Sequence, residues 1–391
     1  MGVIVKITTY LMRGSILIVP LVILVSIFGN SRSYTYKETA VPEPVKLSPR
    51  LRALFEKTKI LCFGRYAIEV PQEAQLVPGN AVLNSDIEIL VGGLENAKQR
   101  ADDEFKKVKW EDDTAEVTYF GPGPIPDSWQ IRYFEDKYKK ERNALFFNTY
   151  ISKGDITFVL GDSISQGETE GTVIARQLAQ AKSLRLRGAV EMPAEPGFCI
   201  EHGFIASDRY TDQETISAGI YFPSLPDITF SVSSNKDAYA DYDKARFEEM
   251  KRDELPLLAR IKGAQKTQGA LYPKRDLLRE GKRDVQHWDG EESLIRRPDG
   301  THDFEWAFVG IPKDVANPSE FHAAMFTKVA NNMVGAAKNA SVTDDEAVAL
   351  WDKLLSSLKF RVKVPGAPEG SYFLRPGKSK TNNVDNEQDK Q

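Results

Sequence analysis

Two short segments of this sequence carry residue types that could act as a nucleophile or bind a phosphate. Gly161–Gly167 holds Ser163 and Ser165 between two glycines, but a serine hydrolase needs the spacing Gly-x-Ser-x-Gly, which this segment misses by two residues. Gly377–Ser379 resembles the end of a phosphate-binding loop, but Tyr372 stands where that loop requires its first glycine. The first segment therefore predicts a polar turn, and neither segment predicts a catalytic residue or a bound nucleotide.

Histidines and paired carboxylates are the other residues that could do chemistry. His287, His302 and His322 all fall within residues 287–322, but no His-Glu-x-x-His or Cys-x-x-Cys spacing occurs in the chain. His302 falls on the aromatic face of an alternating strand, which is typical of a core histidine. Asp344 and Asp345 fit the start of a helix, where acidic side chains are stabilising. The sequence therefore predicts no metal site, no cofactor and no catalytic pair of carboxylates.

The composition indicates a folded protein that does not bind nucleic acid. Of the 391 residues, 41% are hydrophobic, which is enough material for two packed cores. The 52 Lys and Arg residues against 56 Asp and Glu residues give a net charge of -4. The chain therefore lacks the basic excess with which proteins neutralise a phosphate backbone.

The N-terminal segment, residues 1–31, has the pattern of an export signal. Two basic residues precede the apolar run Ile16–Phe28, and Gly29 and Ser31 after it could form a cleavage site. The alternative is an uncleaved anchor in the inner membrane, if the apolar segment reaches the length of a single span. Both alternatives place the body outside the cytoplasm, after a proline-containing linker at residues 32–50.

Cys62 and Cys199 are the two cysteines of the chain. Because an exported protein can keep disulfides, they form a candidate pair. The alternative is two buried thiols, since two cysteines in so long a chain do not make a disulfide framework. The sequence does not supply the Cα separation that would decide between the two.

Between residues 51 and 365 the same order of elements occurs twice. Each half begins with a cysteine-containing strand and ends with a helix and a short basic strand, Ser183–Arg187 or Ser357–Arg361. Between these ends, each half has a strand introduced by aspartate, a charged helix and further strands. This order predicts an α+β fold with two tandem domains that suggest a duplication, each a mainly antiparallel sheet packed by helices on one side.

The domain boundaries follow from local composition. We expect an N-terminal domain at residues 51–190 and a C-terminal domain at residues 195–365. The connection Gly188–Gly197 contains two prolines and predicts a hinge. Residues 366–391 are mostly polar and predict a disordered tail.

Rigid turns beside tryptophans are the feature that stands out most. Gly121–Pro126 precedes Trp129, and Trp288 begins an aspartate-glycine turn at the end of a long excursion, Gly263–Asp289. A rigid loop with an aromatic anchor is suited to gripping another protein, although such a tryptophan can equally fold back onto its own core. The candidate partner-binding residues are Trp129, Trp288, Asp289 and Arg275.

Several stretches resemble a known protein family. They are Cys62–Tyr66 with Val70–Pro71, Phe222–Asp227, Trp288–Glu292 and Leu350–Arg361. These stretches are similar to those of the immunity proteins cognate to the lipase effectors of bacterial type VI secretion. The resemblance extends over residues 51–361 and is strongest in the second half.

The resemblance implies a binding protein and not an enzyme. It implies a periplasmic protein of a Gram-negative bacterium, with N-terminal and C-terminal immunity domains, that captures a cognate phospholipase and blocks its active site or lid. Two other functions stay open: a membrane-anchored adaptor that loads a lipase for secretion, and a cell-envelope hydrolase with an unrecognised site.

Overall fold

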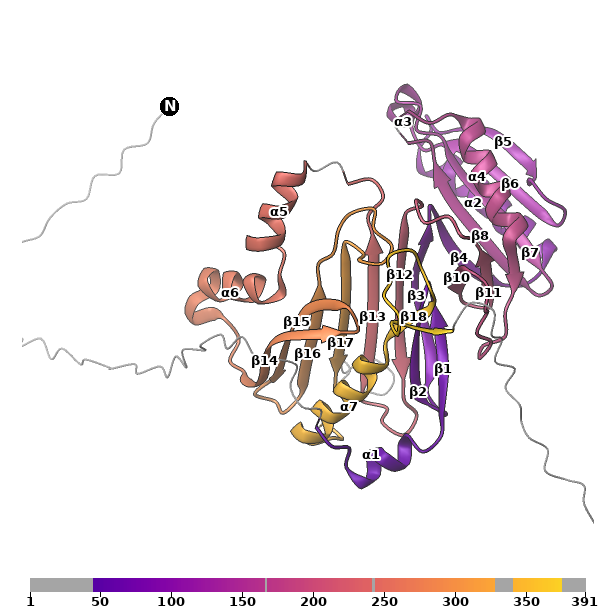
Figure 1. Ribbon diagram of the computed structural model, residues 1–391. Helices are drawn as coiled ribbons and strands as arrows, with labels where there is room; N and C mark the ends of the chain where they lie inside the picture. The colour runs from indigo at the N-terminus through magenta and orange to yellow at the C-terminus, as the bar shows by residue number, and fades with distance from the viewer. Residues whose placement is uncertain (1–44, 166, 241–242, 328–339, 375–391) are drawn as a thin grey trace, which may run out of the picture. The chain divides into compact units, whose positions relative to one another are not determined.

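A computed structural model describes residues 45–165, 167–240, 243–327 and 340–374 (Figure 1). The export signal or anchor predicted at residues 1–31 lies outside the described residues. So do residues 32–44 of the predicted linker and residues 375–391 of the predicted tail. Within the described ranges, no helix is long and apolar enough to cross a membrane.

Both ends of the described body extend further than the sequence predicts. Residues 366–374, predicted as disordered tail, are ordered and include strand β19 (Tyr372–Leu374), which pairs with the preceding strand and buries Leu374. At the other end, Ser48 of the predicted linker caps helix α1 (Pro49–Leu54) by accepting a hydrogen bond from the Leu51 amide. These two predictions are therefore wrong at their inner boundaries.

One sheet of twelve strands forms the centre of the molecule. Every neighbouring pair in it is antiparallel, which confirms the predicted class of sheet. In spatial order the strands are β14 (Asp276–Val285), β15 (Trp288–Arg296), β16 (His302–Phe308), β17 (Glu320–Phe326), β13 (Thr229–Lys236), β12 (Glu214–Tyr221), β3 (Gln75–Leu83), β4 (Ser85–Val91), β8 (Ile156–Ser163), β7 (Phe146–Lys153), β6 (Ser128–Phe134) and β5 (Glu116–Pro122) (Figure 1).

The two halves of the chain meet inside this sheet. The first half supplies β3 to β8 and the second supplies β12 to β17, and the two sets join where β3 pairs with β12. The register there runs from Glu214 opposite Leu83 to Tyr221 opposite Gln75, with one irregularity on the way. The sequence predicts two tandem sheets, and the structure fuses their edges into one.

Two smaller sheets also join the halves. The first contains β1 (Thr58–Phe63), β2 (Tyr66–Pro71), β18 (Lys359–Val362) and β19, and the second contains β10 (Gly197–Ile200), β11 (Gly203–Ala206) and β9 (Leu184–Leu186). In each, the opening hairpin of one half pairs with the closing strand of the other half. This reciprocal exchange matches the duplication that the element order suggests.

The longer helices lie on both faces of the sheet. They are α2 (Leu94–Glu111), α4 (Glu170–Ser183), α5 (Lys244–Asp253), α6 (Leu257–Gln268) and α7 (Asp344–Ser357); α3 (Lys137–Glu141) is a short turn of helix. Helix α2 packs on Ile131 and Tyr133 of β6, whereas α4 packs on Phe134 of the same strand and on Phe147. Because alternate residues of a strand face opposite sides, α2 and α4 cover opposite faces. The prediction of helices on one side only is wrong for the first half.

Helix α7 lies in the main core. Thr343 and Glu346 form the capping box that the sequence predicts at its start. Leu350, Trp351 and Leu354 on this helix are fully buried, and the Trp351 ring contacts Phe230 at a centroid distance of 5.8 Å. The core therefore draws on residues from the whole length of the body.

Candidate functional site

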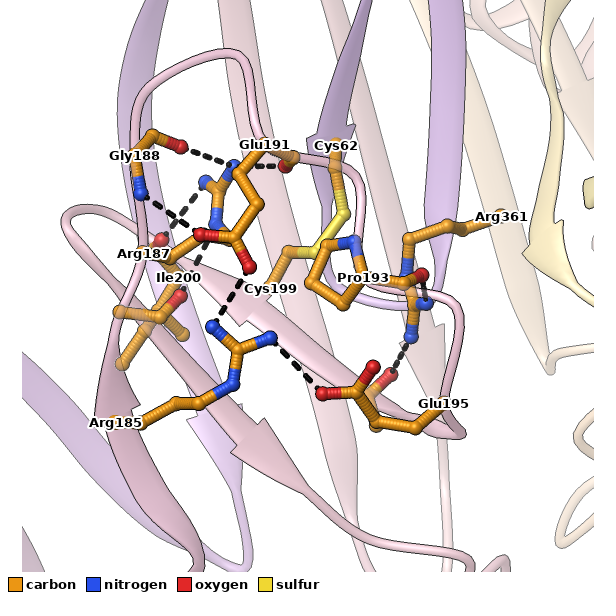
Figure 2. Close-up of a disulfide and its surroundings, with 12 residues drawn as sticks. Cys62, Arg185, Arg187, Gly188, Glu191, Pro193, Glu195, Cys199, Ile200 and Arg361 are labelled. Atoms are coloured by element: carbon orange, nitrogen blue, oxygen red, sulfur yellow. Dashed lines mark hydrogen bonds and ion pairs between the residues drawn. A yellow bond between two sulfur atoms is a disulfide. The ribbon is translucent and has the colours of Figure 1, made fainter. Parts of the chain in front are cut away.

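Cys62 and Cys199 form a disulfide between the two halves of the chain (Figure 2). Cys62 lies on β1 and Cys199 on β10, with 5.9 Å between their Cα atoms, and both are buried. The backbones are also paired here, because Gly64 and Cys199 exchange two hydrogen bonds. Of the two alternatives that the sequence leaves open, the structure has the disulfide.

Buried arginines hold the connection between the halves in place. Arg187 donates hydrogen bonds to the carbonyls of Ile200 and Glu191, and Arg361 donates to those of Pro193 and Gly197 (Figure 2). Burial away from water lowers the pKa of Arg361 to about 10. Residues 188–197 are thus tied to both halves, so the structure does not support the predicted hinge.

Two ion pairs brace the same connection from its exposed side. Arg185 on β9 pairs with Glu191 at 2.7 Å and with Glu195 at 2.9 Å (Figure 2). The two carboxylates raise the pKa of Arg185 against the opposing effect of burial. Exposed pairs of this kind stabilise a fold only weakly, so the buried contacts and the disulfide dominate here.

Trp288, one of the candidate partner-binding residues, lies in the core. Its side chain is fully buried at the start of β15, its indole Nε1 donates to the Ala316 carbonyl at 2.9 Å, and its ring contacts Phe321 and Phe360. Of the two alternatives that the sequence leaves open, the structure has the tryptophan folded onto its own core, because the strand begins at Trp288 and directs it inward; as a partner-binding residue Trp288 is therefore excluded. Only the neighbouring Asp289 faces solvent.

A buried ion pair lies on the same face of β15 as Trp288. Glu292 shares the inward face of β15 with Trp288, and an acidic residue normally marks an exposed face. Here Glu292 is buried because Arg279 pairs with it at 2.6 Å and the Trp351 indole donates to it. An acidic residue therefore occupies the inward face of β15, because its charge is paired.

Trp129 is half-buried near the opposite edge of the sheet. It lies on β6, its ring makes an edge contact with Phe120 at 5.7 Å, and the Lys98 ammonium of α2 lies 5.9 Å from its ring centroid. Among the described atoms, its indole Nε1 has no hydrogen-bond partner. Phe120 on the edge strand β5 is 39% exposed, so this aromatic pair is open to solvent on one side.

Arg275 lies between α6 and β14, next to the short 3-10 turn η1 (Gly269–Leu271). Its guanidinium lies over the Tyr272 ring, 4.7 Å from the centroid, and donates to the Tyr272 hydroxyl. Leu271 beside it is 88% exposed. The predicted excursion thus forms the end of α6, this turn and strand β14.

The four predicted partner-binding residues do not come together. Trp129 belongs to β6, the second strand from one edge, whereas Trp288 and Asp289 belong to β15, the second strand from the other edge. Trp110 was missed by the sequence analysis, although its side chain is 87% exposed on α2. The helical period could have found it, because Ala97, Ala101 and Val108 are buried on the opposite face of that helix.

His302 behaves as the core histidine that its strand position predicts. Its imidazole is almost fully buried, with Nδ1 2.9 Å from the Thr327 hydroxyl and Nε2 2.8 Å from Asp344. Asp344 begins α7, as predicted, and also pairs with Arg296. These contacts join β16 to α7, and they give His302 and Asp344 a structural role.

Sequence profiles of two family domains match this chain in tandem. The profile of the Tle cognate immunity protein 4 N-terminal domain matches residues 59–187, and that of the C-terminal domain matches residues 191–363. The chain belongs to the Tle cognate immunity protein 4 family. This confirms the resemblance and supports an immunity role toward a cognate Tle effector.

Solved structures show the same fold at low sequence identity. The apo immunity protein TplEi of the type VI secretion system from Pseudomonas aeruginosa has a TM-score of 0.60 and 23% identity, over 78% of this chain and 97% of that chain. The crystal structure of the Tle4–Tli4 complex gives the same four values. TplEi complexed with an "L" peptide has a TM-score of 0.58, over 78% of this chain and 99% of that chain. No curated protein matches the chain.

The family domains coincide with the halves described above. The N-terminal domain contains β1 to β9 and the C-terminal domain contains β10 to β18. The disulfide Cys62–Cys199 therefore links two immunity domains, and the connection between them is the loop held by Arg187 and Arg361.

Proposed function

We propose that this member of the Tle cognate immunity protein 4 family binds and inhibits a cognate phospholipase effector of type VI secretion in the periplasm. The observation that carries the proposal is the pair of family domains, each matched along almost its whole half of the body. Such a protein must bind every lipase molecule one-to-one, because each unbound lipase would continue to hydrolyse phospholipid. It needs no catalytic residue or cofactor of its own.

Two features favour the periplasm. The disulfide Cys62–Cys199 is buried, and disulfides of this kind persist in oxidising compartments such as the bacterial periplasm. Residues 1–31 have the pattern of an export signal or of an inner-membrane anchor. The body is on the periplasmic side in either case.

The proposed mechanism is occlusion of the lipase active site or lid by a preformed surface. The two domains are fixed to each other by the β3–β12 pairing, the exchanged strands and the disulfide, so little conformational freedom is lost on binding. Exposed apolar side chains occur toward both edges of the sheet, Trp110 and Phe120 in one domain and Leu271 in the other. A partner that contacts both domains would bury more than the roughly 800 Å² per side of a standard interface.

The test is a titration of the full oxidised chain against the lipase encoded beside its gene, following phospholipid hydrolysis. We expect inhibition that ends sharply near one-to-one stoichiometry. Binding without inhibition would indicate the loading adaptor, and phospholipid turnover by this chain alone would indicate the hydrolase. Failure to bind would overturn the proposal.

A further inference from the structure

Residues 257–275 form a segment with positive charge only. This segment, which contains α6, η1 and the residues up to β14, has five Lys and Arg residues and no Asp or Glu. The preceding helix α5 differs, because its arginines pair with nearby acids: Arg246 with Glu249 at 3.1 Å and Arg252 with Asp253 at 2.9 Å. A solvated surface helix normally carries both signs, so the composition of α6 is unusual.

The rest of the protein compensates this charge only in part. Arg260 pairs with Glu305 at 3.7 Å, and Lys262 and Arg275 both lie close enough to Glu280 to act on its charge. Lys266 and Lys274 are exposed, and neither forms an ion pair with any residue that the structure describes. Two cations at this edge of the sheet are therefore available to an external anionic group.

In the sequence, an exposed apolar side chain and an ordered aromatic lie between these two lysines. Leu271 is 88% exposed, and Tyr272 is held by Arg275 through the ring contact and the hydrogen bond to its hydroxyl. Tyrosine and arginine are enriched among the residues that contribute most to protein interfaces. Because this pair is ordered before binding, it loses little side-chain freedom in a complex.

The chemistry of the segment fits a protein better than a membrane. A helix that lies in a bilayer surface needs a wide apolar face, but α6 buries Leu257 and Leu258 against its own domain. Leu271 is the one large hydrophobic side chain of residues 257–275 that is strongly exposed. One apolar anchor, flanked along the chain by exposed cations, is complementary to a surface with an apolar depression and an acidic rim.

We propose that Lys266, Leu271, Tyr272, Lys274 and Arg275 form a docking surface for an acidic surface of the cognate lipase. This inference rests on the proposed function and locates part of its contact on the C-terminal domain. The surface lies beside the edge strand β14, at the opposite edge of the sheet from β5 (Figure 1). The cations would steer association, and Leu271 and Tyr272 would supply the desolvated centre.

The experiment compares two surface variants with a matched control. The variants are Lys266→Glu/Lys274→Glu and Leu271→Asp. The control is Lys46→Glu/Lys363→Glu, which reverses two exposed lysines elsewhere and so changes the net charge of the protein by the same amount as the first variant. Affinity and association rate for the lipase are measured by surface plasmon resonance at low and at physiological salt, and a melting curve establishes that each variant is folded.

We expect the double reversal to slow association by about tenfold and to abolish most of its salt dependence, with the control unchanged. Leu271→Asp should weaken the equilibrium affinity by about tenfold. Wild-type-like binding by both variants would overturn the docking surface while the proposed function stands. If the wild-type chain itself fails to bind the lipase, the proposed function fails and this inference with it. Binding of wild type to phosphatidylglycerol vesicles that the double reversal abolishes would assign the surface to the membrane and overturn the inference.

Discussion

Trp129 and Trp288 each lie on the second strand from an edge of the same sheet, yet one is half-exposed and the other has no contact with water. The contacts of Trp129 come from its own domain, from Phe120 and Lys98. Trp288 is covered by Tyr66 and Phe360, which belong to the sheet that exchanges strands between the domains. The exchanged strands therefore turn the Trp288 region into a core shared by both domains, while the region around β5 and β6 stays a surface.

The largest expected effect is on the stability of the Trp288 region. Trp288→Ala removes a fully buried indole from among three aromatic rings, and we expect the free energy of unfolding to fall by about 3–5 kcal/mol. Urea denaturation followed by circular dichroism measures it. A loss below about 1 kcal/mol would mean that this region is not the shared core.

Removal of the disulfide should have the next largest effect. Cys62→Ser/Cys199→Ser releases a cross-link between residues 137 positions apart, and we expect a loss of roughly 2–5 kcal/mol. Because the β3–β12 pairing and the β2–β18 pairing remain, unfolding should stay a single transition. Two separate transitions in the calorimetric trace would show that the disulfide alone couples the domains.

The pH dependence of stability can be compared in the two regions through buried tyrosines. Burial raises the pKa of Tyr66 beside Trp288, and of Tyr133 in the cluster that contains Trp129. Above about pH 10 the unfolded chain loses a phenolic proton that the folded chain keeps, so each tyrosine lowers stability as the pH rises. At neutral pH, Tyr66→Phe should lower the free energy of unfolding by about 1 kcal/mol, because the hydrogen bond to Ser234 is lost. Above pH 10 the wild-type protein loses stability through Tyr66 and the variant does not, so the difference in stability between them should become smaller.

Unfolding free energies measured from neutral pH to above pH 10 check this prediction, with Tyr133→Phe as the matched variant for the other region. For both variants, the difference in stability from the wild-type protein should become smaller as the pH rises above 10. A deficit of Tyr66→Phe that grows as the pH rises would contradict the assigned cause.

The smallest effects on stability, and the clearest on binding, belong to the exposed side. Trp110→Ala should change stability by less than about 0.5 kcal/mol, and Trp129→Ala by roughly 1–2 kcal/mol, because their side chains are 87% exposed and half-buried respectively. If the surface that contains Trp110 and Trp129 contacts the lipase, each of these two substitutions should weaken lipase binding by more than about 1 kcal/mol. Calorimetric titration with the lipase measures both. Unchanged affinity for the two variants would remove this face from the interface.

Local patterns were sufficient for many elements. The alternation at His302–Phe308, the capping box at Thr343 and the closing basic strands are present as predicted, because each depends on neighbouring residues only. The α+β class and the two family domains were also accessible, since they follow from the order of the elements and from short shared stretches.

The candidate binding residues were less predictable. A tryptophan beside an aspartate-glycine turn gives the same local pattern whether its strand faces water or core, and the buried Glu292 shows that an acidic residue on β15 does not mark its exposed face. Trp110 could have been found from the helical period, whereas the exposure of Leu271 depends on a turn whose position is set by α6 and β14.

The residue order alone was enough to predict the α+β class, the repeated order of the main elements and the pair of cysteines available to form a bridge, but it did not reveal strands such as β3 and β12. The three-dimensional fold was needed to show that β3 pairs with β12, that each opening hairpin pairs with the closing strand of the other domain, and that Trp288 is buried. The physical reason is that periodicity and capping act over a few residues. The partner of a free strand edge, and the layer that covers a strand face, depend on segments more than a hundred residues apart.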